Sequence, residues 1–158
     1  MSDSSNFPSM RRKDRELSKE EAYEILKSSD YGILSTYNGE YPYGVPVNYV
    51  FDGKAIYIHC ALEGHKIENI KKHPKVCFTV VKNYEVLPDE LSTAYQSAIV
   101  FGKASLIEGE EKINALRALG MKYSNNLEKI EKEIKESGKV TGVIKIVIEY
   151  ISGKARKK

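Results

Sequence analysis

The sequence predicts a single domain of the mainly β class, a small antiparallel barrel of about six strands with flanking helices. The chain has 158 residues, a length that suits one domain. Its hydrophobic share of 41% and charged share of 30% are those of a globular protein with a core. Apolar stretches of strand length alternate with turn sequences, which is typical of antiparallel β structure. Residues 1–10 are expected to form a disordered polar tail and residues 11–158 the domain.

A helix is expected to open the domain. Ser18 is its expected N-cap, and Glu21 stands three residues later, at the spacing of a capping box. Ala22, Ile25 and Leu26 then form an apolar stripe at helical spacing. This stripe indicates that one face of the helix is buried.

Three strands are expected next, over residues 31–37, 41–51 and 55–60. The pairs Asn38-Gly39 and Asp52-Gly53 separate them, and both pairs favour tight hairpin turns because their residues tolerate positive φ. The order is therefore an antiparallel meander. The middle strand contains Pro42 and Pro46, and proline cannot donate to the ladder. We expect this strand to lie at an edge or to be bulged near Pro46.

The second half of the domain is expected to contain three more strands and three helices. The predicted order is a short helix over 65–72, a strand over 75–81, a polar loop over 83–93, a strand over 94–107, helices over 110–123 and 127–136, and a last strand over 140–151. Gly102 is expected to mark a bulge or a bend in the strand that contains it.

Composition argues against several classes of protein. The net charge of +3 comes partly from basic clusters at residues 11–13 and 156–158, which are typical of solvated ends of a chain. No concentrated basic face suggests nucleic-acid binding, although a regulatory protein that binds through these clusters is an alternative. No apolar run is long enough to span a bilayer, and the N-terminus has no apolar signal core. Cys60 and Cys77 lie in apolar stretches, as free cysteines do in reducing compartments, so a cytoplasmic protein is predicted.

The stretch over residues 56–70 has the pattern of a phosphate cradle. It reads as a strand, a loop ending in Gly64, and a helix that opens with His65 and Lys66. A helix start has free backbone N–H groups and the positive end of the dipole, glycine allows close approach of a ligand, and lysine adds a charge. The alternative is an ordinary connection from strand to helix with glycine as the turn residue.

Other segments offer weaker candidates for chemistry. His59 lies late in a strand beside Cys60, where it is either a core histidine or a ligand-facing one; the two side chains should point to opposite faces of the strand. The proline break at Pro46, before Asn48, would free main-chain groups to meet a planar heterocycle, unless this is simply an edge strand. Gln96 and Ser97 could bind phosphate or ring atoms or form a plain loop exit. No metal-ligand set, nucleophile–base pair or dinucleotide fingerprint is found.

The order of these segments resembles the FMN-binding split barrels related to pyridoxamine 5′-phosphate oxidase, and among them the nitroimidazole-resistance (Nim-type) branch. The resemblance runs in the family's order over nearly the whole chain, and each piece alone is weak. The matching pieces are residues 10–15 (MRRKDR), 31–36 (YGILST), 42–49 (PYGVPVNY), 56–59 (IYIH), 64–66 (GHK), 76–78 (VCF), 95–97 (YQS), 100–104 (VFGKA) and 151–155 (ISGKA).

The resemblance implies a six-stranded split barrel that forms a homodimer, with FMN bound at the dimer interface. Matching positions imply three sets of flavin-binding residues and a phosphate site. The main chain of Pro46, Val47 and Asn48 would line the ring; His59, Cys60 and Ala61 would run beside it; His65 and Lys66 would hold the phosphate; and Gln96 and Ser97 would contact the flavin. His65 departs from the family, where lysine or arginine is common.

The function implied is an oxidoreductase that passes electrons from FMN to a small planar acceptor such as a nitroaromatic. In such an enzyme flavin carries out the redox step, and His59 is the expected catalytic residue because imidazole can donate a proton or a hydrogen bond. Oxidation of pyridoxamine phosphate is less expected, because no second basic cluster for a substrate phosphate is found. The alternative is a non-catalytic module that carries flavin, deazaflavin or haem, with a histidine as the axial ligand of a haem iron.

Overall fold

The structure is a computed structural model that describes residues 7–158, and within them it has one eight-stranded sheet and four α-helices. The helices are α1 (Lys19–Ser28), α2 (His65–Lys72), α3 (Gly109–Tyr123) and α4 (Leu127–Ser137). The strands are β1 (Glu16–Leu17), β2 (Gly32–Tyr37), β3 (Pro42–Val47), β4 (Val50–Phe51), β5 (Ala55–Ala61), β6 (Lys75–Leu87), β7 (Ser92–Leu106) and β8 (Thr141–Arg156). The mainly β prediction with flanking helices is confirmed.

The sheet curls into a barrel. Its strand order is β3-β2-β6-β7-β8-β5-β4, with the short β1 paired to β8, and all pairings are antiparallel. The two strands at the ends of this order, β3 and β4, follow one another in the chain with only residues 48–49 between them. The two ends of the sheet are therefore linked through the chain rather than by strand pairing, and the barrel stays open between β3 and β4. The six predicted strands become eight because the expected strand over 41–51 is divided and β1 is added.

The division of the 41–51 strand is a correction to the sequence prediction. Pro46 is paired with Ile33 of β2 inside β3, so the bulge expected near Pro46 does not form there. The break follows at Asn48 and Tyr49, after which β4 pairs with β5. The expected edge position of the prolines is confirmed, because β3 is the end strand of the sheet order.

The polar loop predicted over residues 83–93 is wrong. Strand β6 continues to Leu87 and β7 begins at Ser92, so the two form a long hairpin with a register shift between Lys82 and Glu85. Tyr84 and Val86 are 73% and 62% exposed, so this hairpin extends past the core and has little need of apolar alternation. Polar composition here reflects solvation of a projecting ribbon rather than loss of strand structure.

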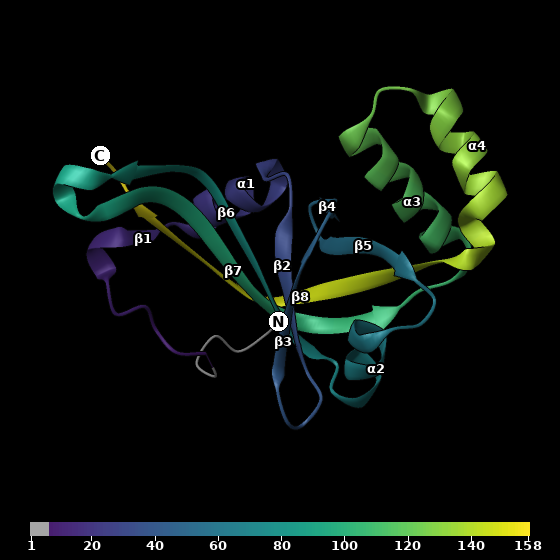
Figure 1. The fold of residues 1–158 in the computed structure, drawn as a ribbon, viewed down its shortest axis with the longest axis horizontal. Helices are drawn as coiled ribbons and strands as arrows, with labels where there is room; N and C mark the ends of the chain where they lie inside the picture. The colour runs from purple at the N-terminus through teal and green to yellow at the C-terminus, as the bar shows by residue number, and fades with distance from the viewer. Residues whose placement is uncertain (1–6) are drawn as a thin grey trace.

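The barrel interior is one apolar cluster, and helices close it. Ala22 and Leu26 of α1 are fully buried in this cluster together with Leu34, Phe78 and Ile144 of the strands. The predicted capping box that starts α1 is present. On α2 the side chain of Asn69 is buried as well, and its amide donates to the Thr36 hydroxyl at 2.9 Å. In Figure 1, α1 and α2 lie on opposite sides of the crossing strands.

Two parts of the chain extend from the barrel in opposite directions. Figure 1 shows the α3–α4 pair at one end of the long axis and the tip of the β6–β7 hairpin, with the C-terminus, at the other. The predicted bulge near Gly102 is confirmed as a register shift between Phe101 and Gly102. The last strand runs to Arg156, five residues beyond its predicted end at residue 151.

The N-terminal tail is described only from Phe7 onward. Disorder of residues 1–6 stays a prediction, because these residues lie outside the described part of the chain. The Phe7 ring stacks on those of Phe101 and Tyr150, with centroids 5.6 Å and 4.8 Å away, so the packed chain begins before the boundary predicted at residue 10. No helix within residues 7–158 is long and apolar enough to cross a membrane.

Candidate functional site

The start of α2 is an open N-terminus of the kind that binds phosphate. Gly64 is its N-cap with φ +142°, a backbone conformation that favours glycine, and no side chain caps the helix. A Cβ built on Gly64 would meet no atom within 4 Å, so the space in front of the helix is free. Lys66 is half-buried in the first turn. The geometry agrees with the cradle predicted from the sequence.

His65 is anchored against β3. Its ring stacks on Tyr43, with centroids 4.2 Å apart and the planes within 16°. This contact brings the start of α2 next to the strand that carries Pro46 and Val47. An imidazole used in stacking is held in place, which gives a reason for a ring at this position instead of a flexible basic chain.

The break between β3 and β4 is held by two side chains from the end of α3. The Tyr49 N–H donates to the Tyr123 hydroxyl at 3.1 Å, and that hydroxyl donates to the Asp30 carbonyl oxygen. The Lys122 ammonium donates to the carbonyl oxygens of Tyr49 and Ser29 at 2.8 Å and 2.7 Å. It also lies 3.7 Å from the centroid of the Tyr49 ring. The main-chain groups freed at Tyr49 are therefore used within the fold.

The contacts of Lys122 and Tyr123 leave the residues just before Tyr49 free to bind a ligand. Asn48, just before Tyr49, is exposed, and so is Pro46. Within residues 7–158 the outer edge of β3 has no strand beside it. The edge over Pro46 to Asn48 is therefore the main chain left open to a ligand, while the groups of Tyr49 are not available.

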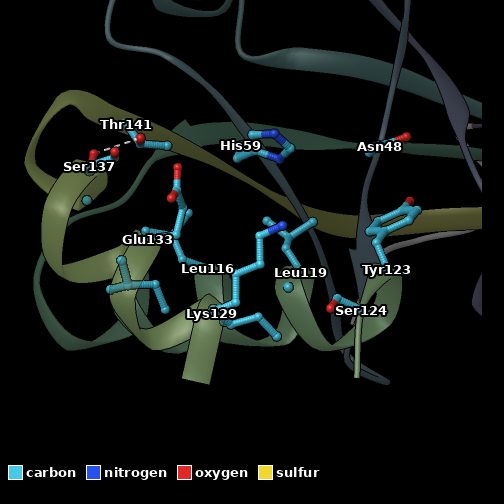
Figure 2. A pocket seen from close by; sticks show the side chains of 14 residues that line it. Asn48, His59, Leu116, Leu119, Tyr123, Ser124, Lys129, Glu133, Ser137 and Thr141 are labelled. Atoms are coloured by element: carbon cyan, nitrogen blue, oxygen red, sulfur yellow. Dashed lines mark hydrogen bonds between the residues drawn. The ribbon is translucent and has the colours of Figure 1, made fainter. Parts of the chain in front are cut away.

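His59 and Asn48 stand where two cavities meet. A cavity of about 460 Å³ is lined by both residues together with Tyr31, Pro46 and Val47. A second cavity, of about 420 Å³, is also lined by both and extends under α3 and α4. Figure 2 shows the His59 ring projecting from its strand into the space between Thr141 and Tyr123. His59 is exposed, so the core-histidine alternative is excluded.

Cys60 and Ala61 complete the end of β5. Cys60 is half-buried and His59 exposed, as the alternation of a strand requires. Burial raises the pKa of the Cys60 thiol, while the charges of Lys66 and Lys112 act in the opposite direction. The thiol is therefore protonated at neutral pH and acts as a packing group rather than a nucleophile. No group of three or more metal-ligating side chains is found within the described chain.

Gln96 and Ser97 are not part of this cluster within one chain. Ser97 pairs with Lys154 of β8 and donates to its carbonyl oxygen at 3.1 Å, and Gln96 accepts from the Asn83 amide at 2.7 Å. His59 pairs with Val143 of the same strand. Val143 and Lys154 are eleven residues apart (143 to 154). At about 3.3 Å per residue that is roughly 35 Å along the strand.

Sequence reasoning missed the residues that α3 and α4 contribute. Lys122 and Tyr123 hold the strand break, and Lys129 and Glu133 line the second cavity. Nothing in their local pattern sets them apart from the exposed residues of an amphipathic helix. Burial lowers the pKa of Lys122 from 10.5 to about 8, against the opposing charge of Asp30, so its setting departs strongly from that of a solvated lysine.

Comparison with known proteins places the chain in one family. The family model described as pyridoxamine 5′-phosphate oxidase matches residues 18–155. That range runs from the N-cap of α1 almost to the end of β8. No curated protein matches the chain.

Solved structures share the fold at low sequence identity. A candidate 5-nitroimidazole antibiotic resistance protein from Bacteroides thetaiotaomicron is 24% identical over 89% of this chain and 86% of its own, with a TM-score of 0.72. An FAD-binding protein from Mesorhizobium loti is 20% identical over 90% of this chain and 98% of its own, at 0.67. An FAD- and haem-binding protein from Mycobacterium smegmatis is 16% identical over 89% and 72%, also at 0.67.

Proposed function

We propose that this chain, which belongs to the pyridoxamine 5′-phosphate oxidase family, is a flavoprotein that binds FMN and transfers electrons to a small planar acceptor. One observation carries the proposal: strand β3 contacts the start of α2, and its end leads into the cavities that His59 of β5 also lines. Tyr43 and His65 join β3 to α2 by stacking, and Asn48 and His59 line the same cavities.

The residues present fit a flavin with one phosphate. The free N–H groups and the open space at Gly64, with the Lys66 charge, suit a phosphate dianion. The edge over Pro46, Val47 and Asn48, which has no strand beside it, would offer main-chain donors and acceptors to a ring, and Cys60 and Ala61 would run beside the bound flavin. The flavin would supply the redox chemistry when bound. His59, exposed beside that edge, would hold or donate a proton to the reacting molecule.

The proposed assembly is a homodimer with the site between two copies. Gln96 and Ser97 lie too far from His59 to share a site with it in one chain, as the pairing along β8 indicates. A second copy could place its own hairpin against the first copy's site. Val81 of β6 and Ile99 of β7 are 52% and 37% exposed, so the two paired strands have apolar surface for such a contact. Sedimentation of the purified protein at a dimer mass would support this.

The proposed acceptor is a nitroaromatic, and the proposed electron donor is a nicotinamide. Support for the acceptor is the shared fold with the candidate 5-nitroimidazole antibiotic resistance protein and the open, partly apolar cavities beside His59. The donor is tested by adding NADH or NADPH to the flavin-loaded protein without oxygen. Bleaching of the flavin bands followed by their return when a nitroaromatic is added supports the oxidoreductase. Bands that persist with both nicotinamides refute the nicotinamide-dependent version.

The cofactor is tested by the visible spectrum of the purified protein before and after addition of FMN. Retained flavin bands support the proposal, and Lys66→Ala should weaken FMN binding about tenfold, since one charge-assisted contact contributes about 1.5 kcal/mol or more. Lys72→Ala is the matched control, because Lys72 is an exposed lysine in the last turn of the same helix. Equal effects of the two substitutions would contradict the cradle.

A non-catalytic flavin or haem carrier is the second candidate, and the exposure of His59 at the junction of two cavities favours it as a haem ligand. The same spectrum separates the possibilities. A sharp haem band would make His59→Ala the next variant, and tighter retention of FAD than of FMN would replace the mononucleotide with the dinucleotide. A colourless protein that retains neither flavin nor haem would refute the assignment.

A further inference from the structure

The cavity under α3 and α4 has the features of a binding site for a small molecule. Its volume of about 420 Å³ is enough for a compound with one or two rings. The apolar part of its wall comes from both helices of the pair, and His59 and Asn48 stand at its strand side (Figure 2). The apolar wall residues are Leu116, Leu119, Ile130 and Ile134.

Two opposite charges of α4 face this cavity without pairing. Lys129 and Glu133 are one helical turn apart, a spacing at which an ion pair commonly forms, and both line the cavity. Among the described residues 7–158, neither side chain has a hydrogen-bond or ion-pair partner. Figure 2 shows the Lys129 chain extending toward His59 and the Glu133 carboxylate toward Thr141.

The cavity is therefore polarised along its length. The end at His59 carries the positive charge of Lys129, and the Asn48 amide lies on the same side. The other end carries the negative charge of Glu133, and there the Thr141 hydroxyl is already used, since it donates to the Ser137 carbonyl oxygen at 2.8 Å. An anionic group would be attracted to the first end and repelled from the second.

We propose that this cavity binds small aromatic carboxylates, with the ring between α3 and α4 and the carboxylate at Lys129 on the His59 side. Lys129 is thus a specificity-determining residue, and Glu133 sets the orientation by excluding the anion from the far end. Because the cavity lies next to the proposed flavin site, this ligand would be the substrate or a substrate analogue. That identification rests on the proposed function. The binding itself depends only on the cavity.

The test is titration of the full chain, with and without FMN, with benzoate and with its neutral counterpart benzamide. Methyl resonances of Leu116 and Ile130 report binding in the cavity. Saturable shifts with benzoate are expected, weakened about tenfold in Lys129→Met by loss of one charge-assisted contact. Benzoate should bind roughly threefold more tightly to Glu133→Gln, because a repulsive charge is removed. Lys132→Met, an exposed lysine of α4 that does not line the cavity, should change nothing.

Tighter binding in Glu133→Gln together with weaker binding in Lys129→Met supports the inference, because damage to the fold would weaken both. Absence of saturable shifts up to about 10 mM benzoate, roughly ten times the dissociation constant of about 1 mM expected for so small a ligand, overturns it. Equal affinity for benzamide and benzoate overturns it as well, as does an equal loss in Lys129→Met and Lys132→Met. Flavin retention without benzoate binding refutes this inference alone, and benzoate binding without flavin retention refutes the proposed function alone.

Discussion

Substitution of Lys122 by methionine should remove a specific pH dependence of stability. In the folded chain the Lys122 ammonium is half-buried against the Tyr49 ring and bonded to the carbonyl oxygens of Ser29 and Tyr49. Burial lowers its pKa from 10.5 to about 8. Between those two values the unfolded chain still holds a proton that the folded chain has released. The free energy of unfolding therefore rises with pH over this window.

The size of the effect follows from the two pKa values. With about 8 in the folded chain and 10.5 in the unfolded chain, this one group makes the free energy of unfolding rise by about 2 kcal/mol between roughly pH 7.5 and pH 9.5. Burial also raises the pKa of the Tyr49 phenol above its ordinary value of 10.0, so that group loses stability as the pH rises beyond about 10. The measurement therefore belongs below pH 10.

The assay is urea unfolding of the wild type and of Lys122→Met at about pH 7.5, 8.5 and 9.5, within the window set by the lysine. The wild type should gain about 2 kcal/mol relative to the variant across this series. Lys27→Met, which removes an exposed lysine in the last turn of α1, should run parallel to the wild type. If the Lys122→Met curve also runs parallel to the wild type, the ammonium is not desolvated as described and the reasoning is refuted.

Two further substitutions test how α3 is attached. Tyr123→Phe removes the hydroxyl that joins the Tyr49 N–H to the Asp30 carbonyl, and should lower the free energy of unfolding by about 1–3 kcal/mol. A loss below about 0.5 kcal/mol in urea unfolding would show that these hydrogen bonds do not hold α3 to the strand break. Gly120→Ala places a Cβ 2.7 Å from a methyl of Ile130. The resulting overpacking should lower the free energy of unfolding by about 1–3 kcal/mol, more than the gain of up to about 1 kcal/mol from the higher helix propensity of alanine. Adding Ile130→Ala should give a loss smaller than the sum of the single losses, and strict additivity would count against close packing.

Local sequence signals predicted the parts of this fold that neighbouring residues control. The capping box of Ser18 and Glu21 forms as expected, with both bonds at 3.1 Å, and Gly39 and Gly53 adopt the positive φ of their predicted turns. The start of α2 after Gly64 belongs to the same class, because a strand, a glycine and a helix start are all read within a few residues. Such features depend on backbone preferences and need no distant partner.

Where the sequence prediction was wrong, a distant partner decided the outcome. The strand break at Asn48 and Tyr49 is stabilised by side chains of Lys122 and Tyr123, more than seventy residues away in the chain. The hairpin over 83–93 forms because two strands pair outside the core, where the hydrophobic pattern that identifies strands is not required. Neither effect leaves a signal in the local composition.

The sequence by itself determined the mainly β class, the capping box of α1, the hairpin turns and the start of α2 after Gly64, since each follows from the conformational preferences of adjacent residues. Only the tertiary structure decided which candidates share a site. It brought Asn48 and His59 to the same two cavities and docked the start of α2 against Tyr43 of β3. It also separated Gln96 and Ser97 from His59 along β8, and brought Lys129 and Glu133 over the cavity beside His59. The physical reason is that strand pairing and helix docking are set by the burial of the whole core, which no short stretch of sequence contains.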